Sequence, residues 1–185
     1  PDAGKLVYFS REALGKDYEA ALAELFSDKI QKASHDVKSL MRQLLDAHLP
    51  IEGFCFDTAL AAYLIDPTQG HYELERLTVS YLNFEPAKPN AEEVGETPAR
   101  LAALFSRTAS VSALVEPMQE KLRSMELERL FEEVELPLCP VLARMEHEGV
   151  AADQFALMSF GQMLSERIDA TQDAVYRYAG EEFNI

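Results

Sequence analysis

The sequence has few of the residues that mark secreted or membrane-spanning proteins. It contains no tryptophan and only two cysteines, Cys55 and Cys139, which stand far apart in apolar surroundings. A disulfide framework is therefore not expected, and a reducing cytoplasm fits this cysteine usage better. No apolar run approaches the roughly 20 residues that span a bilayer, and the first residues lack the charged-then-apolar pattern of a signal peptide. We expect a cytoplasmic protein with no membrane contact.

Basic residues are also scarce. Lys and Arg number 17 against 32 Asp and Glu, which gives a net charge of −15, and residues 125–185 carry 13 acidic but only 4 basic side chains. Proteins that grip DNA neutralise its phosphates with Lys and Arg, and single-strand binders add stacking aromatics to a basic groove. No stretch shows that combination. We expect weak or no DNA binding by this chain alone.

The first half of the sequence alternates short β-type segments with helical patterns. Its 185 residues suit one domain with an appendage or two small domains. The predicted strands are Leu6–Phe9, Lys29–Ser34 and Gly53–Phe56, and the predicted helices cover residues 17–26, 37–49, 58–65 and 74–81. This alternation predicts an α/β layer with parallel strand pairing.

The second half reads as helical after a loop. Residues 84–98 contain three prolines and little apolar content, which predicts a loop. Apolar residues then recur at helical spacing over residues 101–118, 127–145 and 157–178. Pro137 and Pro140 are expected to kink or divide the middle run, while Gly149 and Asp153 predict a helix end and a helix start.

Residues 56–70, FDTALAAYLIDPTQG, predict a helix that Asp57 or Thr58 caps and that ends at Asp66-Pro67, with a turn at Gly70 after it. This stretch resembles the 3′–5′ exonuclease-like domain of the bacterial, Gram-positive type DNA polymerase I family (family A). Three further blocks resemble the same family in the same order. They are the second exonuclease motif at Ser34–Leu40, the passage into the polymerase domain at Glu135–Asp153, and the turn before the thumb at Ala179–Ile185.

The resemblance implies a ribonuclease-H-like exonuclease fold, followed by long α-helices that lead into a polymerase domain. We assign residues 1–124 to a vestigial exonuclease-like domain and residues 125–185 to the helical start of the polymerase domain. The family's first exonuclease strand, with its Asp-x-Glu pair, precedes the strand matched to Leu6–Phe9, so the fold is expected to be truncated at its N-terminal end. The parent would be a Mg²⁺-dependent, nucleoid-associated DNA polymerase of replication and repair. Its nucleotide-addition carboxylates lie beyond Ile185, and this fragment is expected to hold no cofactor.

The exonuclease motifs are incomplete. Two-metal phosphodiester hydrolysis needs several carboxylates around ions roughly 3.5–4 Å apart. The resemblance places Asp36 at a metal-ligand position, although a helix cap is the simpler interpretation of this residue. Phe105 and Ala109 stand where the third motif has Tyr and Asp, and Arg107 adds positive charge between them. We therefore expect an inactive, structural domain with no confident catalytic or metal-binding residue.

Two alternatives stay open. The first is a weakly active, metal-dependent 3′–5′ exonuclease that uses Asp36 with a displaced carboxylate. The second is a single-strand binding module, which the net charge disfavours. The last predicted helix also carries an apolar stripe that needs a partner, so self-association is possible. Its members are Leu157, Leu164, Ile168 and Val175.

Overall fold

The computed structural model describes residues 6–87 and 97–182. The chain divides into two compact units, Pro1–Glu148 and Gly149–Ile185, and each is described by itself. The domain boundary expected between residues 124 and 125 separates an exonuclease-like domain from a polymerase domain. It stays a prediction. No helix within the described ranges combines the length and the apolar character needed to cross a membrane.

The expected strand at Leu6–Phe9 is wrong. These four residues form no regular structure, and their side chains are 41–58% exposed. A β-rich sequence forms a strand only where a neighbouring strand and a buried face receive it, and here the segment has no buried face. The helices that follow begin at the capping residue Ser10. They are α1 (Arg11–Leu14), the 3₁₀ turn η1 (Gly15–Asp17) and α2 (Tyr18–Leu25).

The sheet that the described residues form has two parallel strands, β1 (Lys32–Ser34) and β2 (Phe54–Asp57). Helix α3 (Val37–Asp46) connects them. Ser34 pairs with Asp57, and the register shifts between Lys32 and Ala33. The parallel pairing expected from the sequence is thus confirmed for these two strands, which both lead directly toward helices at the same edge of the sheet.

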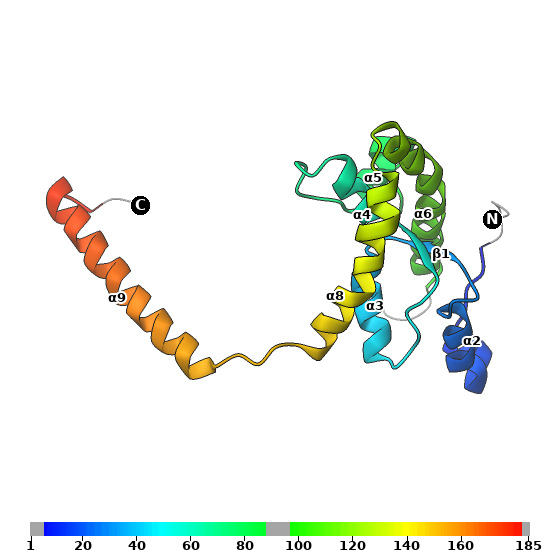
Figure 1. Ribbon diagram of the computed structural model, residues 1–185, viewed down its shortest axis with the longest axis horizontal. Helices are drawn as coiled ribbons and strands as arrows, with labels where there is room; N and C mark the ends of the chain where they lie inside the picture. Colours follow the sequence, from blue (N-terminus) through cyan, green and yellow to red (C-terminus); the bar gives the residue numbers. More distant parts are fainter. Residues whose placement is uncertain (1–5, 88–96, 183–185) are drawn as a thin grey trace. The chain divides into compact units, whose positions relative to one another are not determined.

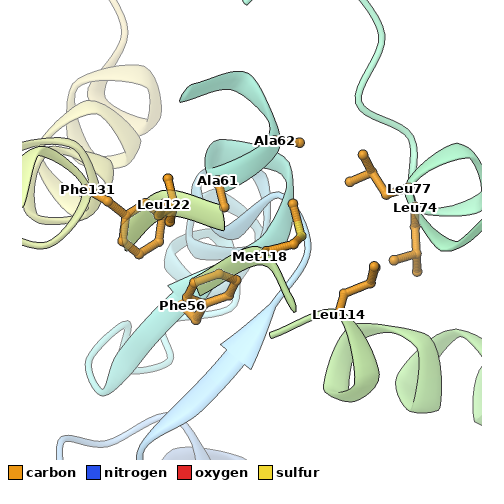
Figure 2. Close-up of a cluster of buried hydrophobic side chains, with 9 residues drawn as sticks. All are labelled: Phe56, Ala61, Ala62, Leu74, Leu77, Leu114, Met118, Leu122 and Phe131. Atoms are coloured by element: carbon orange, nitrogen blue, oxygen red, sulfur yellow. The ribbon is translucent and has the colours of Figure 1, made fainter. Parts of the chain in front are cut away.

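The main core lies where β2 meets the next three helices, α4 (Thr58–Ile65), α5 (Leu74–Leu82) and α6 (Pro98–Ser124). Figure 2 shows its side chains gathering from the strand, these helices and the segment that follows them. The members are Phe56, Ala61, Ala62, Leu74, Leu77, Leu114, Met118, Leu122 and Phe131. The loop expected over residues 84–98 falls mostly outside the described residues. Its described part has no regular structure through Ala87. The expected end of the loop is wrong at Pro98, which is the first residue of α6 after the capping residue Thr97.

The middle helical run is not divided at Pro137 or at Pro140, so the expected division at these prolines is wrong. It consists of α7 (Glu128–Leu130), the π-helical turn η2 (Phe131–Glu135) and α8 (Leu136–Glu148). Helix α8 follows η2 without a break and contains both Pro137 and Pro140. Helix α8 packs lengthwise on α3 (Figure 1). That contact buries a second cluster, comprising Val37, Met41, Leu44, Ile51, Cys139 and Ala143.

The second unit is built around one long helix, α9 (Gln154–Ala179). It starts as expected, because the Asp153 carboxylate accepts a hydrogen bond from the Ala156 N–H at 3.0 Å. It ends at Gly180, which has a φ of 81°. No residue of α9 is buried, and Phe155 is 85% exposed.

Candidate functional site: the strand-end junction

Asp57 is the last residue of β2 and the N-cap of α4. Its side chain is 3% exposed and accepts four backbone hydrogen bonds. One oxygen, Oδ1, accepts from the N–H groups of Ala59 and Leu60 at 2.9 and 3.3 Å and from Asp36 at 3.0 Å, and Oδ2 accepts from Val37 at 2.8 Å. Asp57 therefore caps its own helix and also holds the first turn of α3.

Burial raises the pKa of the Asp57 carboxyl, and the four N–H donors act in the opposite direction. The N-termini of α3 and α4 add a favourable dipole for negative charge. Both oxygens of the side chain serve only as acceptors, which is the role of a carboxylate. The Asp57 carboxylate thus stabilises the backbone at the starts of α3 and α4 through four hydrogen bonds.

Asp36 begins α3 with a left-handed backbone, φ 54° and ψ 62°, a conformation that Asp tolerates better than most residues. Its carboxylate accepts from the Ser39 N–H at 3.4 Å and is exposed. The preceding residue, His35, contacts the buried Thr58 hydroxyl through Nδ1 at 2.9 Å. Burial lowers the pKa of His35, while the nearby carboxylates of Asp57 and Asp36 raise it.

Two further charged side chains come from helices α5 and α6 and contact each other. The guanidinium of Arg107 donates to the Glu75 carboxylate, and the two side chains are 33% and 20% exposed. Both groups act electrostatically on His35, Arg107 lowering its pKa and Glu75 raising it. We call His35, Asp36, Asp57, Thr58, Glu75 and Arg107 the strand-end junction.

The junction does not fit a divalent metal ion. A Mg²⁺ or Mn²⁺ pair needs several carboxylate oxygens aimed at a common point. Here Asp57 is saturated by backbone donors, Glu75 is paired with Arg107, and Asp36 caps a helix. Over residues 6–87 and 97–182, no three His, Cys, Asp or Glu side chains are grouped so that they could hold a metal.

The structure describes all three residues that the sequence singled out for the exonuclease site. Asp36 is a helix cap, and its assignment as a remnant metal ligand stays a prediction. Phe105 and Ala109 lie on α6, two residues before and two residues after Arg107 in the sequence. Phe105 is half-buried and Ala109 is exposed. They bring neither a hydroxyl nor a carboxylate.

Two features of the junction were missed from the sequence. Asp57 was expected to cap one helix, and no pattern revealed that it also holds a second helix. Glu75 was not singled out at all, because it and Arg107 are 32 residues apart and no local spacing links them. The sequence showed Arg107 as a charge near the site but could not show its partner.

Comparison with known proteins connects this fold to one family. Residues 2–86 match the family described as DNA polymerase I, ribonuclease H-like domain. The chain is 32% identical over 172 residues to DNA polymerase I of Geobacillus stearothermophilus, a match that covers 89% of this chain and 20% of that protein. It is 30% identical over 191 residues to DNA polymerase I of Mycobacterium tuberculosis H37Rv, covering 98% of this chain and 21% of that protein.

A solved structure agrees with these relatives. It is the POL domain of Pol1 from M. smegmatis in complex with DNA primer-template and dNTP, with a TM-score of 0.74 and 30% identity. The match covers 96% of this chain and 29% of that one. The chain thus spans about a fifth of the length of the curated relatives it matches. It belongs to the DNA polymerase I family and carries that family's ribonuclease H-like fold, followed by long helices.

Proposed function

We propose that this chain is the part of a DNA polymerase I in which the ribonuclease H-like domain has a structural role and no exonuclease activity. One observation carries the proposal: each carboxylate of the strand-end junction is committed to holding the fold. Asp57 holds two helix N-termini, Glu75 holds Arg107, and Asp36 caps α3. None is left to converge on an ion with the others.

Packing supports the same role. The α3–α8 contact joins the ribonuclease H-like part to the helix that resembles the passage into the polymerase domain. Its buried apolar residues are accompanied by two polar contacts between the same helices, Lys38 with Glu146 at 2.5 Å and His147 with Asp46 at 2.9 Å. We infer that the domain supports the base of the polymerase domain and maintains its spacing from the 5′-nuclease domain.

The parent protein would bind DNA and add nucleotides with Mg²⁺, in the cytoplasm and at the nucleoid. This acidic segment would contribute little to DNA binding, since its net charge is −15. Filter binding of the 185-residue chain to single-stranded DNA at low salt is the check. Tight, salt-sensitive retention would contradict this part of the proposal.

The test of inactivity uses the intact polymerase with Mn²⁺ and a 5′-labelled single strand, without nucleotides. We expect no shortening from the 3′ end. The control is the Asp36→Ala variant of the same polymerase, which should behave identically. Trimming that Asp36→Ala abolishes would overturn the proposal and establish the alternative, a weakly active metal-dependent 3′–5′ exonuclease.

A further inference from the structure

The ammonium group of Lys32 lies among three backbone carbonyl oxygens. They belong to Ser27, Ile30 and Glu52, and their distances from Nζ are 3.0, 2.7 and 2.7 Å. We call these three oxygens the carbonyl cage. A lysine ammonium has three N–H donors and no acceptor, so each donor has a partner in the cage. Nζ also lies 5.2 Å from the centroid of the Phe54 ring, which adds a cation–π contact.

The backbone that forms the carbonyl cage is also joined without the lysine side chain. Two of the carbonyls come from the connection between α2 and β1, and the third precedes β2. The Glu52 N–H donates to the Phe26 carbonyl at 3.1 Å. The Lys32 N–H donates to the Gly53 carbonyl at 2.9 Å, and the rings of Phe26 and Phe54 stack. We therefore expect the three oxygens to stay grouped when the side chain of Lys32 is shortened.

Gly53 leaves room for the cation. Its φ is 77°, and an added Cβ would lie 2.5 Å from the Lys32 Nζ. The same atom would lie 2.4 and 2.6 Å from the carbonyl oxygens of Ile30 and Ser27. Any side chain at position 53 would therefore enter the carbonyl cage. The space among the oxygens suits one compact cation.

We propose that the carbonyl cage is a binding site for a monovalent cation, which the Lys32 ammonium occupies in the wild-type chain and which a free ammonium or potassium ion occupies when that side chain is shortened. Backbone carbonyl oxygens can replace the hydration shell of potassium, and an ammonium ion is of similar size. The site lies at the amino ends of β1 and β2, whereas the strand-end junction lies at their carboxyl ends.

The bound charge has a structural consequence for the sheet. It fastens the α2–β1 connection to the residues that precede β2, next to the point where the strand register shifts between Lys32 and Ala33. Beyond that shift Ser34 pairs with Asp57. The occupant of the carbonyl cage thus helps to fix which residues meet at the end of the two strands.

The test is thermal unfolding of the 185-residue chain in NH₄Cl, KCl or tetramethylammonium chloride at equal concentration, each variant being compared with wild type in the same salt. In tetramethylammonium chloride, whose cation is too large for the cage, Lys32→Ala and Lys32→Met should both melt about 6 °C below wild type, because the carbonyls have lost a charged donor. Ammonium or potassium should raise the melting temperature of Lys32→Ala by about 3 °C. Lys32→Met should not respond, because its side chain still fills the cage.

The matched control is Lys29→Ala, which changes an exposed lysine of the same connection. It should melt like wild type in all three salts. The proposal is overturned if Lys32→Met is as stable as wild type, because the lysine would then act only through packing. It is also overturned if neither small cation stabilises Lys32→Ala more than Lys32→Met.

A measurement on the wild-type chain keeps the proposal testable if Lys32→Ala does not fold. Brief acetylation with an N-hydroxysuccinimide ester, followed by peptide mass spectrometry, compares the reactivity of individual lysines. Lys32 should react about tenfold more slowly than Lys29, because its ammonium must leave three carbonyls before it can lose a proton and attack. Gly53→Ala should reduce this protection, and Gly180→Ala should not. Equal reactivity of Lys32 and Lys29 in wild type would contradict the proposal.

Discussion

The two units of this chain contain similar apolar residues, but these residues are buried in the first unit and exposed in the second. In the first unit, Phe131 is 2% exposed and packs against Phe56 with ring centroids 5.0 Å apart. In the second unit, Phe155 is 85% exposed on a helix with the same kind of apolar pattern. The difference shows that an amphipathic sequence specifies a helix, whereas burial depends on what other elements present to it. Matched substitutions in the two units measure that difference.

The largest contrast is expected between the two phenylalanines. Phe131→Ala should destabilise the first unit by about 3–5 kcal/mol, because it removes a large buried side chain and leaves a cavity. Phe155→Ala should change the free energy of unfolding by less than about 0.5 kcal/mol, because the ring is already in water. Urea unfolding followed by far-UV circular dichroism measures both. Equal effects would mean that Phe155 is covered in solution, by self-association or by another contact.

The two helix-capping aspartates should differ next. Asp57→Ala should cost about 3 kcal/mol, because it removes a helix cap and also strands the buried N–H groups of a second helix. Asp153→Ala removes one exposed cap and should cost about 1 kcal/mol, confined to α9. Hydrogen exchange resolved by residue separates the two, since Asp57→Ala should weaken protection in both α3 and α4. Loss confined to α4 would contradict the double cap.

Two glycines with similar backbones provide the third comparison. Gly53 has a φ of 77°, and an added Cβ would lie 2.4 Å from the Ile30 carbonyl oxygen and 2.5 Å from the Lys32 ammonium. Gly180 has a φ of 81° with nothing within 4 Å of such an atom. Gly53→Ala should therefore cost about 2 kcal/mol or more through strain and displaced backbone, and Gly180→Ala about 1 kcal/mol at the end of α9. Thermal unfolding of the two variants measures which substitution destabilises the chain more. A smaller loss of stability for Gly53→Ala than for Gly180→Ala would contradict this prediction.

The smallest effect concerns pH and only the first unit, because residues 149–185 contain no histidine. Burial lowers the pKa of His35 in the folded chain, so below about pH 6.5 the unfolded chain binds the proton more readily. Stability should fall as the pH drops through that value, by at most about 1.4 kcal/mol per pH unit for this group. The raised pKa of Asp57 acts with the opposite sign in the acidic range where carboxylates titrate.

Urea unfolding of wild type and His35→Gln between about pH 7.5 and pH 5.5 isolates the His35 contribution. The variant should show a flatter dependence, and the exposed His71→Gln substitution is the matched control that should leave the slope unchanged. A wild-type slope that His35→Gln does not alter would assign the pH dependence to other groups.

Local sequence by itself determined most helices and their ends. The apolar periodicity of residues 37–49 and 101–118 specified α3 and α6, and the short acidic side chains of Asp36, Asp57 and Asp153 specified caps, because capping needs only groups within a few residues. The parallel pairing of β1 and β2 also followed from the strand–helix alternation.

Tertiary structure alone decided the remainder. It left Leu6–Phe9 without a place in the sheet, since strand formation depends on a neighbour that no local pattern encodes. It paired Glu75 with Arg107, and it brought Asp57 to the first turn of α3, where its carboxylate accepts from the Val37 N–H. Both contacts join residues that are 20 or more positions apart. It also buried Phe131 and exposed Phe155. Helix periodicity and capping act within a few residues, whereas burial and charge pairing depend on distant segments that only folding brings together.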